Sequence, residues 1–114
     1  MSLQCVFCRI AAKEIPSTIV YEDDDVVAFR DLSPQAPTHV LVISRRHVDS
    51  LDHMADSDAG LLGAMMLAAK NVAATAGLAA GYRVVTNCGV NAGQSVSHIH
   101  LHLLGGRPMA WPPG

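Results

Sequence analysis

The chain has 114 residues, half of them apolar, and a net charge of −2 with its histidines neutral. These values predict one globular domain, because a chain of this length buries about two-thirds of its unfolded surface on folding. They exclude a disordered chain, and they provide no excess of positive charge for duplex nucleic acid as the main partner.

The N-terminal part of the chain predicts a short helix followed by a hairpin. Residues 5–13 carry apolar side chains at helical spacing, and Pro16 stops this helix. Residues 18–21 and 26–30 are rich in β-branched and aromatic side chains, which predicts two strands. The acidic segment 22–25 between them is typical of an exposed turn.

A loop, a strand and a long helix are predicted next. Residues 31–37 contain two prolines and must form a loop, whereas the β-branched residues 39–44 predict a third strand. Asp56 or Ser57 can cap a helix that runs to about Ala76. We interpret its apolar stripe as core packing; the stripe contains Leu61, Leu62, Met65, Met66, Ala69, Val72, Ala73 and Ala76.

Two further strands complete the predicted fold. Residues 82–87 predict a strand, residues 89–95 a polar loop with glycines, and residues 99–103 the last strand. The tail from residue 107 onward is too rich in proline for the interior of a helix or sheet. Because consecutive strands are joined by short turns, the sequence predicts an α+β fold with a five-stranded antiparallel sheet, one long helix and one short helix.

Three histidines alternate with apolar residues along the last strand. Successive side chains point to opposite faces of a strand, so His98, His100 and His102 are expected on one face, with neighbouring imidazoles about 6–7 Å apart. Ile99 and Leu101 then face the core. Two kinds of chemistry fit this pattern: a catalytic metal held by three histidines, or attack of a neutral imidazole on phosphorus.

The loop before this strand favours the second interpretation. Its sequence, Gly-Val-Asn-Ala-Gly-Gln-Ser over residues 89–95, leaves backbone N–H groups accessible and adds the Gln94 amide and the Ser95 hydroxyl. Such a concave set of donors suits phosphate or another anion. A glycine loop directly before a histidine strand therefore indicates phosphoryl chemistry.

At this point the sequence resembles a known family. The segment His98-Ile-His-Leu-His-Leu-Leu104 matches the His-x-His-x-His-x-x signature of the histidine triad (HIT) superfamily, and the similarity covers nearly the whole chain. Residues 93–107 and 31–39 resemble the branch of histidine triad nucleotide-binding proteins, which hydrolyse nucleoside phosphoramidates. The diadenosine polyphosphate hydrolase branch is less similar. The galactose-1-phosphate uridylyltransferase branch has Gln where this chain has His102.

The resemblance implies a role for several residues. His100 would attack the α-phosphorus of a purine nucleoside phosphoramidate such as an AMP-amine, and water would then hydrolyse the nucleotidyl-histidine adduct. His102 and Ser95 would bind phosphate oxygens or the departing group, and Asp31 would accept the ribose hydroxyls. His39 would join a proton network, unless it is only a histidine at the end of a strand. Near the nucleotide the resemblance places Phe7, Ile10, Phe29, Leu32, Asn87, Gly93, Gln94 and Trp111, although plain core packing also explains the first four.

Cysteine spacing raises the question of a metal. Cys5 and Cys8 form a C-x-x-C pair, which by itself fits a redox pair, a metal knuckle or coincidence. The resemblance implies a structural zinc bound by Cys5, Cys8, His47 and His98, so that His98 would not be catalytic. No metal is needed for the phosphorus chemistry. The third cysteine, Cys88, is expected to be a small buried apolar residue.

The remaining expectations concern location, assembly and other functions. The chain has no apolar run long enough for a bilayer and no secretory signal pattern, and its odd cysteine count suits a reducing compartment, which together predict a cytoplasmic protein. The resemblance implies a homodimer with one sheet continued across the interface, and a tail that brings Trp111 to the partner's site; a frayed tail is the alternative. Competing functions are a nucleotide sensor or scaffold with vestigial turnover, a diadenosine polyphosphate hydrolase, and a zinc hydrolase.

Overall fold

The computed structural model describes residues 4–114 and confirms the predicted architecture. Within these residues it contains a five-stranded antiparallel sheet, one long helix and one short helix, joined by 3-10 turns. No helix in the described part is both long and apolar enough to cross a membrane. The elements are α1 (Val6–Ala11), β1 (Ile19–Glu22), β2 (Val26–Arg30), β3 (Thr38–Ser44), α2 (Ala59–Thr75), β4 (Tyr82–Val85) and β5 (His100–Gly105).

Both helices are shorter than the sequence pattern predicts. α1 starts directly after Cys5, whose Sγ accepts a hydrogen bond from the amide three residues later at 3.4 Å and so caps the helix. α2 follows a 3-10 turn in which the Asp58 carboxylate accepts a hydrogen bond from the Ala55 amide at 2.8 Å. This tighter turn replaces the first helical turn, so α2 starts later than a cap at Asp56 or Ser57 would require.

The strand order β1-β2-β3-β5-β4 places β3 and β5 in the interior of the sheet. In the antiparallel register, Leu41 lies opposite His102 and Ile43 opposite His100. Residues directly opposite each other share a face of the sheet, so both histidines lie on the same face as Leu41 and Ile43. β5 begins one residue later than the predicted strand of residues 99–103 and ends two residues later, so that His98 lies just before the strand.

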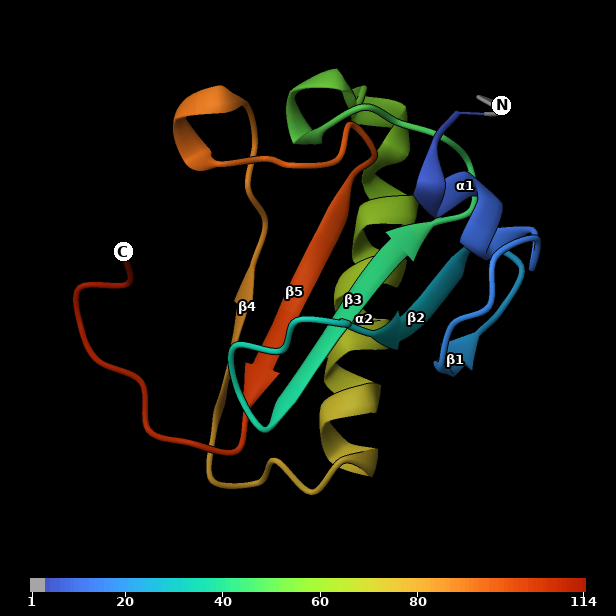
Figure 1. Cartoon of the computed structure of the whole chain (residues 1–114). Coiled ribbons are helices and arrows are strands. Elements are labelled where there is room, and N and C mark those ends of the chain that lie inside the picture. The colour runs from blue at the N-terminus through green and yellow to red at the C-terminus, as the bar shows by residue number, and fades with distance from the viewer. Residues whose placement is uncertain (1–3) are drawn as a thin grey trace.

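Each face of the sheet carries its own core, and a different helix packs against each core. Figure 1 shows α2 running along one face, whereas α1 lies near the start of β2 and the end of β3. The α2 core includes Val26, Ala28, Val40, Val42, Ile99, Leu101 and Leu103. The α1 core consists of Phe7, Ile10, Ala11, Val27, Phe29, Leu41 and Ile43. The histidine face is therefore the α1 face.

The buried stripe of α2 is narrower than the sequence pattern predicts. Met66 is 46% exposed and Ala76 is also exposed, whereas Ala68 is buried at a position outside the predicted stripe. The buried positions follow the i, i+3, i+4, i+7 spacing of a single face, which leaves part of the apolar surface of the helix in solvent. The fully buried residues of this face are Met65, Ala68, Ala69, Val72 and Ala73.

Candidate active site

His100 is a buried imidazole with one nitrogen held by the backbone. Its Nδ1 lies 2.7 Å from the carbonyl oxygen of His98, and the ring is 3% exposed. A carbonyl can only accept, so Nδ1 carries the proton and donates it. In the tautomer that this hydrogen bond fixes, Nε2 carries the unshared electron pair, and an imidazole nitrogen of this kind can act as a nucleophile.

Aromatic neighbours hold the His100 ring in place. The Phe7 ring of α1 meets it edge to face, with ring centroids 5.0 Å apart, and also meets Phe29 at 5.6 Å. The centroids of His100 and His102 lie 5.0 Å apart, closer than the predicted 6–7 Å, because the two rings are tilted toward each other. α1 thus connects the nucleophile to the apolar core of the same face.

His39 and His102 form a second pair of imidazoles beside His100. The backbone N–H of Gln35 donates to Nδ1 of His39 at 3.0 Å, so the proton of His39 must lie on Nε2. That N–H lies 2.9 Å from Nδ1 of His102, with Oδ2 of Asp31 farther away at 3.5 Å. His102 consequently carries its own proton on Nε2. The structure brings together three residues, Asp31, His39 and His102, to which the sequence assigned roles near the substrate.

Burial keeps this pair of imidazoles neutral. It lowers the pKa of His39 below the ordinary value of 6.5, and the charge of Asp31 only partly opposes the shift. Burial also lowers the pKa of His102, with further contributions from His100 and His39 in the same direction. Neutral rings agree with the single proton that the hydrogen bonds assign to each of them.

The residues expected around the base divide into buried and exposed groups. Phe7, Ile10 and Phe29 are at most 7% exposed and pack in the α1 core of the histidine face. Asp31 lies at the edge of this core, with a side chain that is 20% exposed. Leu32 is 97% exposed and lies outside the cluster.

The glycine loop is braced by Gln94. Gly89 and Gly93 adopt positive φ angles of 87° and 79°, which glycine tolerates without strain. The Gln94 side chain accepts a hydrogen bond from the Gly89 amide and donates to the carbonyl oxygens of Asp49 and Val96. Its amide therefore supports the loop, a role that the sequence pattern does not suggest.

Ser95 and Asn87 are two further polar residues with a predicted role near the substrate. Ser95 is exposed and lines a shallow hollow together with Cys5 and His47. Asn87 is half-buried just beyond the end of β4. Cys88, which follows it, is also half-buried and not fully buried as predicted, because it lies outside both cores.

Two cysteines and two histidines gather at the other end of the histidine row. The ligand atoms of Cys5, Cys8, His47 and His98 all lie within 4.8 Å of one another. Nδ1 of His98 is 3.3 Å from Sγ of Cys5 and 3.5 Å from Sγ of Cys8, and Nδ1 of His47 is 3.2 Å from Sγ of Cys8. Tetrahedral zinc, with bonds of about 2.3 Å to sulfur and 2.0–2.1 Å to nitrogen, separates such atoms by about 3.5 Å. The donor set therefore fits zinc.

Hydrogen bonds from the far side of each ring prepare both histidines as ligands. Nε2 of His98 donates to the carbonyl oxygen of Ser44 at 2.7 Å, and Nε2 of His47 donates to the Asp49 carboxylate at 2.7 Å. Both Nδ1 atoms therefore present electron pairs to the sulfurs, an arrangement common behind metal-bound histidines. Burial lowers the pKa of His98 to about 4, which keeps the ring neutral.

The three histidines of the row do not converge on one ion. Among residues 4–114, His98 belongs to the cysteine set and His102 to a set with Asp31 and His39, whereas His100 belongs to neither. The arrangement that a zinc hydrolase with three histidine ligands would need is therefore not found. The sequence pattern missed this because it specifies the face of a side chain but not the direction of its nitrogens.

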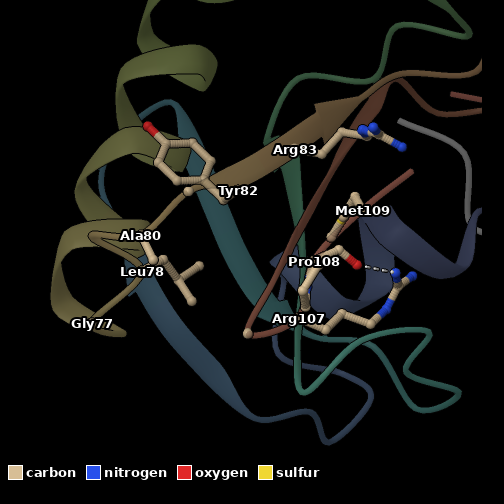
Figure 2. A pocket seen from close by; sticks show the side chains of 10 residues that line it. Gly77, Leu78, Ala80, Tyr82, Arg83, Arg107, Pro108 and Met109 are labelled. Carbon is tan, nitrogen blue, oxygen red and sulfur yellow. Dashed lines mark hydrogen bonds between the residues drawn. The ribbon is translucent and has the colours of Figure 1, made fainter. Parts of the chain in front are cut away.

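The C-terminal tail folds against its own β4. Arg83 donates to the carbonyl oxygen of Ala110 at 2.9 Å, and Trp111 is 81% exposed. A hollow of about 570 Å³ lies between the tail, β4 and the end of α2 (Figure 2). It is lined by Tyr82, Arg83, Arg107 and Met109 among others, away from the row of histidines.

The described residues form a small α+β protein with two buried or half-buried histidines on an inner strand and a Cys₂His₂ cluster just before the start of that strand. A family model described as the HIT domain matches residues 12–109. The chain belongs to this family, which confirms the resemblance.

Similar proteins cover almost the whole chain. The "14 kDa zinc-binding protein" of Zea mays is 54% identical over 96% of this chain and 87% of its own length. "Adenylylsulfatase HINT1" of Arabidopsis thaliana is 50% identical over 96% of this chain and 76% of its own length. The crystal structure of a HIT family hydrolase from Legionella pneumophila Philadelphia 1 superposes with a TM-score of 0.95 at 51% identity, and covers 97% of this chain and 100% of that chain.

Proposed function

We propose that the protein hydrolyses purine nucleoside phosphoramidates through a covalent nucleotidyl-histidine on His100. The single observation that carries this proposal is the hydrogen bond from Nδ1 of His100 to the His98 carbonyl, which leaves Nε2 unprotonated. Nε2 forms a bond to the α-phosphorus, and the P–N bond of the substrate breaks. The departing nitrogen takes the electron pair of that bond and one proton from solvent, and leaves as an amine.

The second step regenerates the histidine. A water oxygen bonds to phosphorus, the bond from phosphorus to Nε2 breaks, and the electron pair returns to His100. The products are a nucleoside monophosphate and the free imidazole, with the water proton passing to solvent. Two displacements of moderate difficulty replace one difficult displacement by water.

Neighbouring residues supply binding groups. The Nε2–H of His102 donates to a phosphate oxygen or to the departing group, and Ser95 with the Gly93 loop provides further donors. Asp31 accepts the ribose hydroxyls. The base lies against the apolar side of the site near Phe7, Ile10 and Phe29, with Leu32, Asn87, Gln94 and Trp111 farther out.

A second candidate substrate differs only in its leaving group. The Arabidopsis relative is named an adenylylsulfatase, and an adenylyl sulfate offers the same α-phosphorus to His100. The two substrates therefore share the nucleophile and the covalent intermediate. Parallel assays with an AMP-amine and with adenylyl sulfate separate them.

We infer that Cys5, Cys8, His47 and His98 hold a structural zinc ion. The spacing of their ligand atoms and the name of the maize relative support this inference. The ion would tie α1 to the segment that leads into β5, and it would leave His100 free for chemistry. Cysteines that form no disulfide in the described part of the chain suit a reducing compartment such as the cytoplasm.

The active form is proposed to be a homodimer. β4 is an edge strand with unpaired backbone groups, and the exposed apolar residues Met66, Leu67 and Tyr82 are 46%, 58% and 44% exposed. Pairing of two β4 strands would continue the sheet and cover these side chains. Sedimentation analysis of the wild-type chain and of Leu67→Glu tests this arrangement, because the variant should be monomeric.

The decisive experiment compares wild-type protein with His100→Ala. Wild-type protein should release AMP from adenosine 5′-phosphoramidate and form a trapped adenylyl-histidine adduct detectable by mass spectrometry. His100→Ala should lose turnover by at least about 10³-fold and still bind AMP. Turnover that persists in the variant, or wild-type protein no faster than the variant, would refute the proposal; the second outcome would favour a sensor or scaffold.

A further inference from the structure

Arg107, immediately after β5, clamps a single carbonyl of a distant loop. Its Nε and Nη2 atoms both donate to the carbonyl oxygen of Gln35, at 3.2 and 3.1 Å. The third bond, from Nη1, goes to the carbonyl oxygen of Pro108, as Figure 2 shows. Two donors of one planar guanidinium on the same oxygen fix both the position and the direction of that carbonyl group.

The residue held by this clamp also contacts the active site. The Gln35 N–H donates to Nδ1 of His39 at 3.0 Å. Because a backbone N–H can only donate, this bond assigns the proton of His39 to Nε2 without ambiguity. Pro34 and Pro37 flank the segment and restrict its backbone, so the clamp acts on a stiff loop.

The position of the proton on His39 determines the position of the proton on His102. Nε2–H of His39 donates to Nδ1 of His102 at 2.9 Å, and the His39 side chain is only 5% exposed, so little water competes for this bond. Nδ1 of His102 must therefore be unprotonated, and its Nε2 carries the hydrogen. Hydrogen bonds from Arg107 to Gln35, from Gln35 to His39 and from His39 to His102 thus connect Arg107 to the protonation of a nitrogen in the proposed active site.

The two glycines before Arg107 are explained by the same arrangement. Gly106 has a φ of 91°, and a Cβ atom on it would lie 2.9 Å from Cβ of Pro37. At Gly105 a Cβ atom would lie 2.6 Å from Cδ1 of Leu78. At Gly106, a residue without a side chain lets the chain turn closely past Pro37 and bring the guanidinium to the Gln35 carbonyl, whereas Gly105 leaves room for the Leu78 side chain.

We propose that Arg107 is a positioning residue whose clamp on Gln35 fixes the tautomers of His39 and His102, so that His102 presents a hydrogen-bond donor to the substrate phosphate. The role of the phosphate rests on the proposed function, whereas the tautomer assignment does not. When Arg107 no longer holds the Gln35 carbonyl, the backbone at Gln35 can turn its N–H away from His39, and His39 can then place its proton on Nδ1 and accept through Nε2. His102 then donates from Nδ1, and its Nε2 turns an electron pair toward the anionic oxygens, which repels them.

The primary test measures tautomers directly in the ligand-free protein. Nitrogen-15 NMR of wild-type protein should show His39 and His102 each protonated at Nε2 and bare at Nδ1. Arg107→Gln should give a mixture of tautomers at both rings. Arg83→Gln is the matched control, because Arg83 also donates to a carbonyl of the tail but not to Gln35.

A binding measurement provides a second readout. The affinity ratio of AMP to adenosine isolates the contribution of the phosphate, and it should fall about tenfold in Arg107→Gln, the scale of one hydrogen bond to a charged group. Arg107→Lys retains the positive charge without the planar fork and should show most of the same fall. Arg83→Gln should keep the wild-type ratio.

Several results would overturn the proposal. Unchanged tautomers in Arg107→Gln would do so, as would a mixture of tautomers in Arg83→Gln, which would point to the tail. Full recovery of the AMP-to-adenosine ratio by Arg107→Lys would show that charge alone matters. If wild-type protein fails to hydrolyse phosphoramidates, the proposed function fails while the NMR result still decides the role of Arg107.

Discussion

His98 and His100 are two residues apart on the same row, yet the fold gives them opposite chemistry. His98 donates from Nε2 to the Ser44 carbonyl, so its Nδ1 faces the cysteine sulfurs. His100 donates from Nδ1 to the His98 carbonyl, so the electron pair of its neutral ring lies on Nε2. The ring nitrogen that donates to a backbone carbonyl therefore determines which nitrogen of each imidazole presents an electron pair to its surroundings.

The two ends of the histidine row also differ in the groups that hydrogen-bond to their imidazole rings. At the metal end, one carbonyl and one carboxylate each hold a single ring, and both rings point inward to one set of sulfurs. At the catalytic end, His39 and His102 are connected in series and reach back to a loop. Loss of one contact near the cysteines should therefore weaken metal binding by one histidine. Loss of one contact near His39 should change which nitrogen of His102 donates a hydrogen bond.

The largest effect should come from removing the two cysteines at the proposed metal site. Cys5→Ser combined with Cys8→Ser should remove one equivalent of zinc and lower the free energy of unfolding by several kcal/mol, on the order expected for a structural zinc. Elemental analysis and urea unfolding measure both quantities. His100→Ala, the matched variant at the other end, should keep the full zinc content. Wild-type protein purified without chelator that contains no zinc would contradict the metal assignment.

A smaller effect on metal affinity is expected when the carboxylate that supports His47 is removed. Asp49→Asn removes the carboxylate that holds Nε2 of His47, and zinc affinity should fall roughly 10- to 100-fold, as is typical for such supporting groups. Competition with a colorimetric chelator measures the affinity. Turnover of zinc-saturated Asp49→Asn should match wild-type turnover. An unchanged affinity would mean that the tautomer of His47 is set in another way.

The catalytic end should make stability depend on pH. His39 and His102 have lower pKa values in the folded chain than the ordinary 6.5, so the unfolded chain binds more protons below that pH. The contribution of these two histidines to the free energy of unfolding should therefore reach its full value above about pH 6.5. It should decrease as the pH falls below that value. Urea unfolding at a series of pH values measures the slope, which should be shallower in His39→Gln. Equal slopes for both proteins would contradict a neutral buried His39.

The smallest effect concerns the ring contact that holds the nucleophile. Phe7→Leu keeps the apolar core but removes the edge-to-face contact with His100, worth about 1 kcal/mol. The rate constant kcat should fall several-fold, with zinc content unchanged. Ile10→Leu, a change in the same helix and core, should leave kcat near the wild-type value. Equal losses in the two variants would assign the effect to general packing.

The sequence by itself determined the fold class, the five strands and the residue types of both histidine regions. These features depend on local periodicity and on the chemistry of single side chains, and both can be recognised without a fold. Helix starts were harder to predict, because a cap at Cys5 and a 3-10 turn before α2 depend on individual hydrogen bonds. The role of Gln94 in supporting the loop could not be predicted, because its three hydrogen bonds within the protein are not apparent from the glycine pattern.

Only the tertiary structure decided which nitrogen of each histidine carries a proton. His39 and His102 are 63 residues apart, and the Arg107 clamp joins residues 72 apart, so no local pattern contains these bonds. The antiparallel pairing of β3 with β5 brings the segments together, and the loop of residues 31–37 then supplies the one amide that orients the pair. Whether a ring nitrogen carries a proton depends on the group that hydrogen-bonds to it. The tertiary fold determines which group that is.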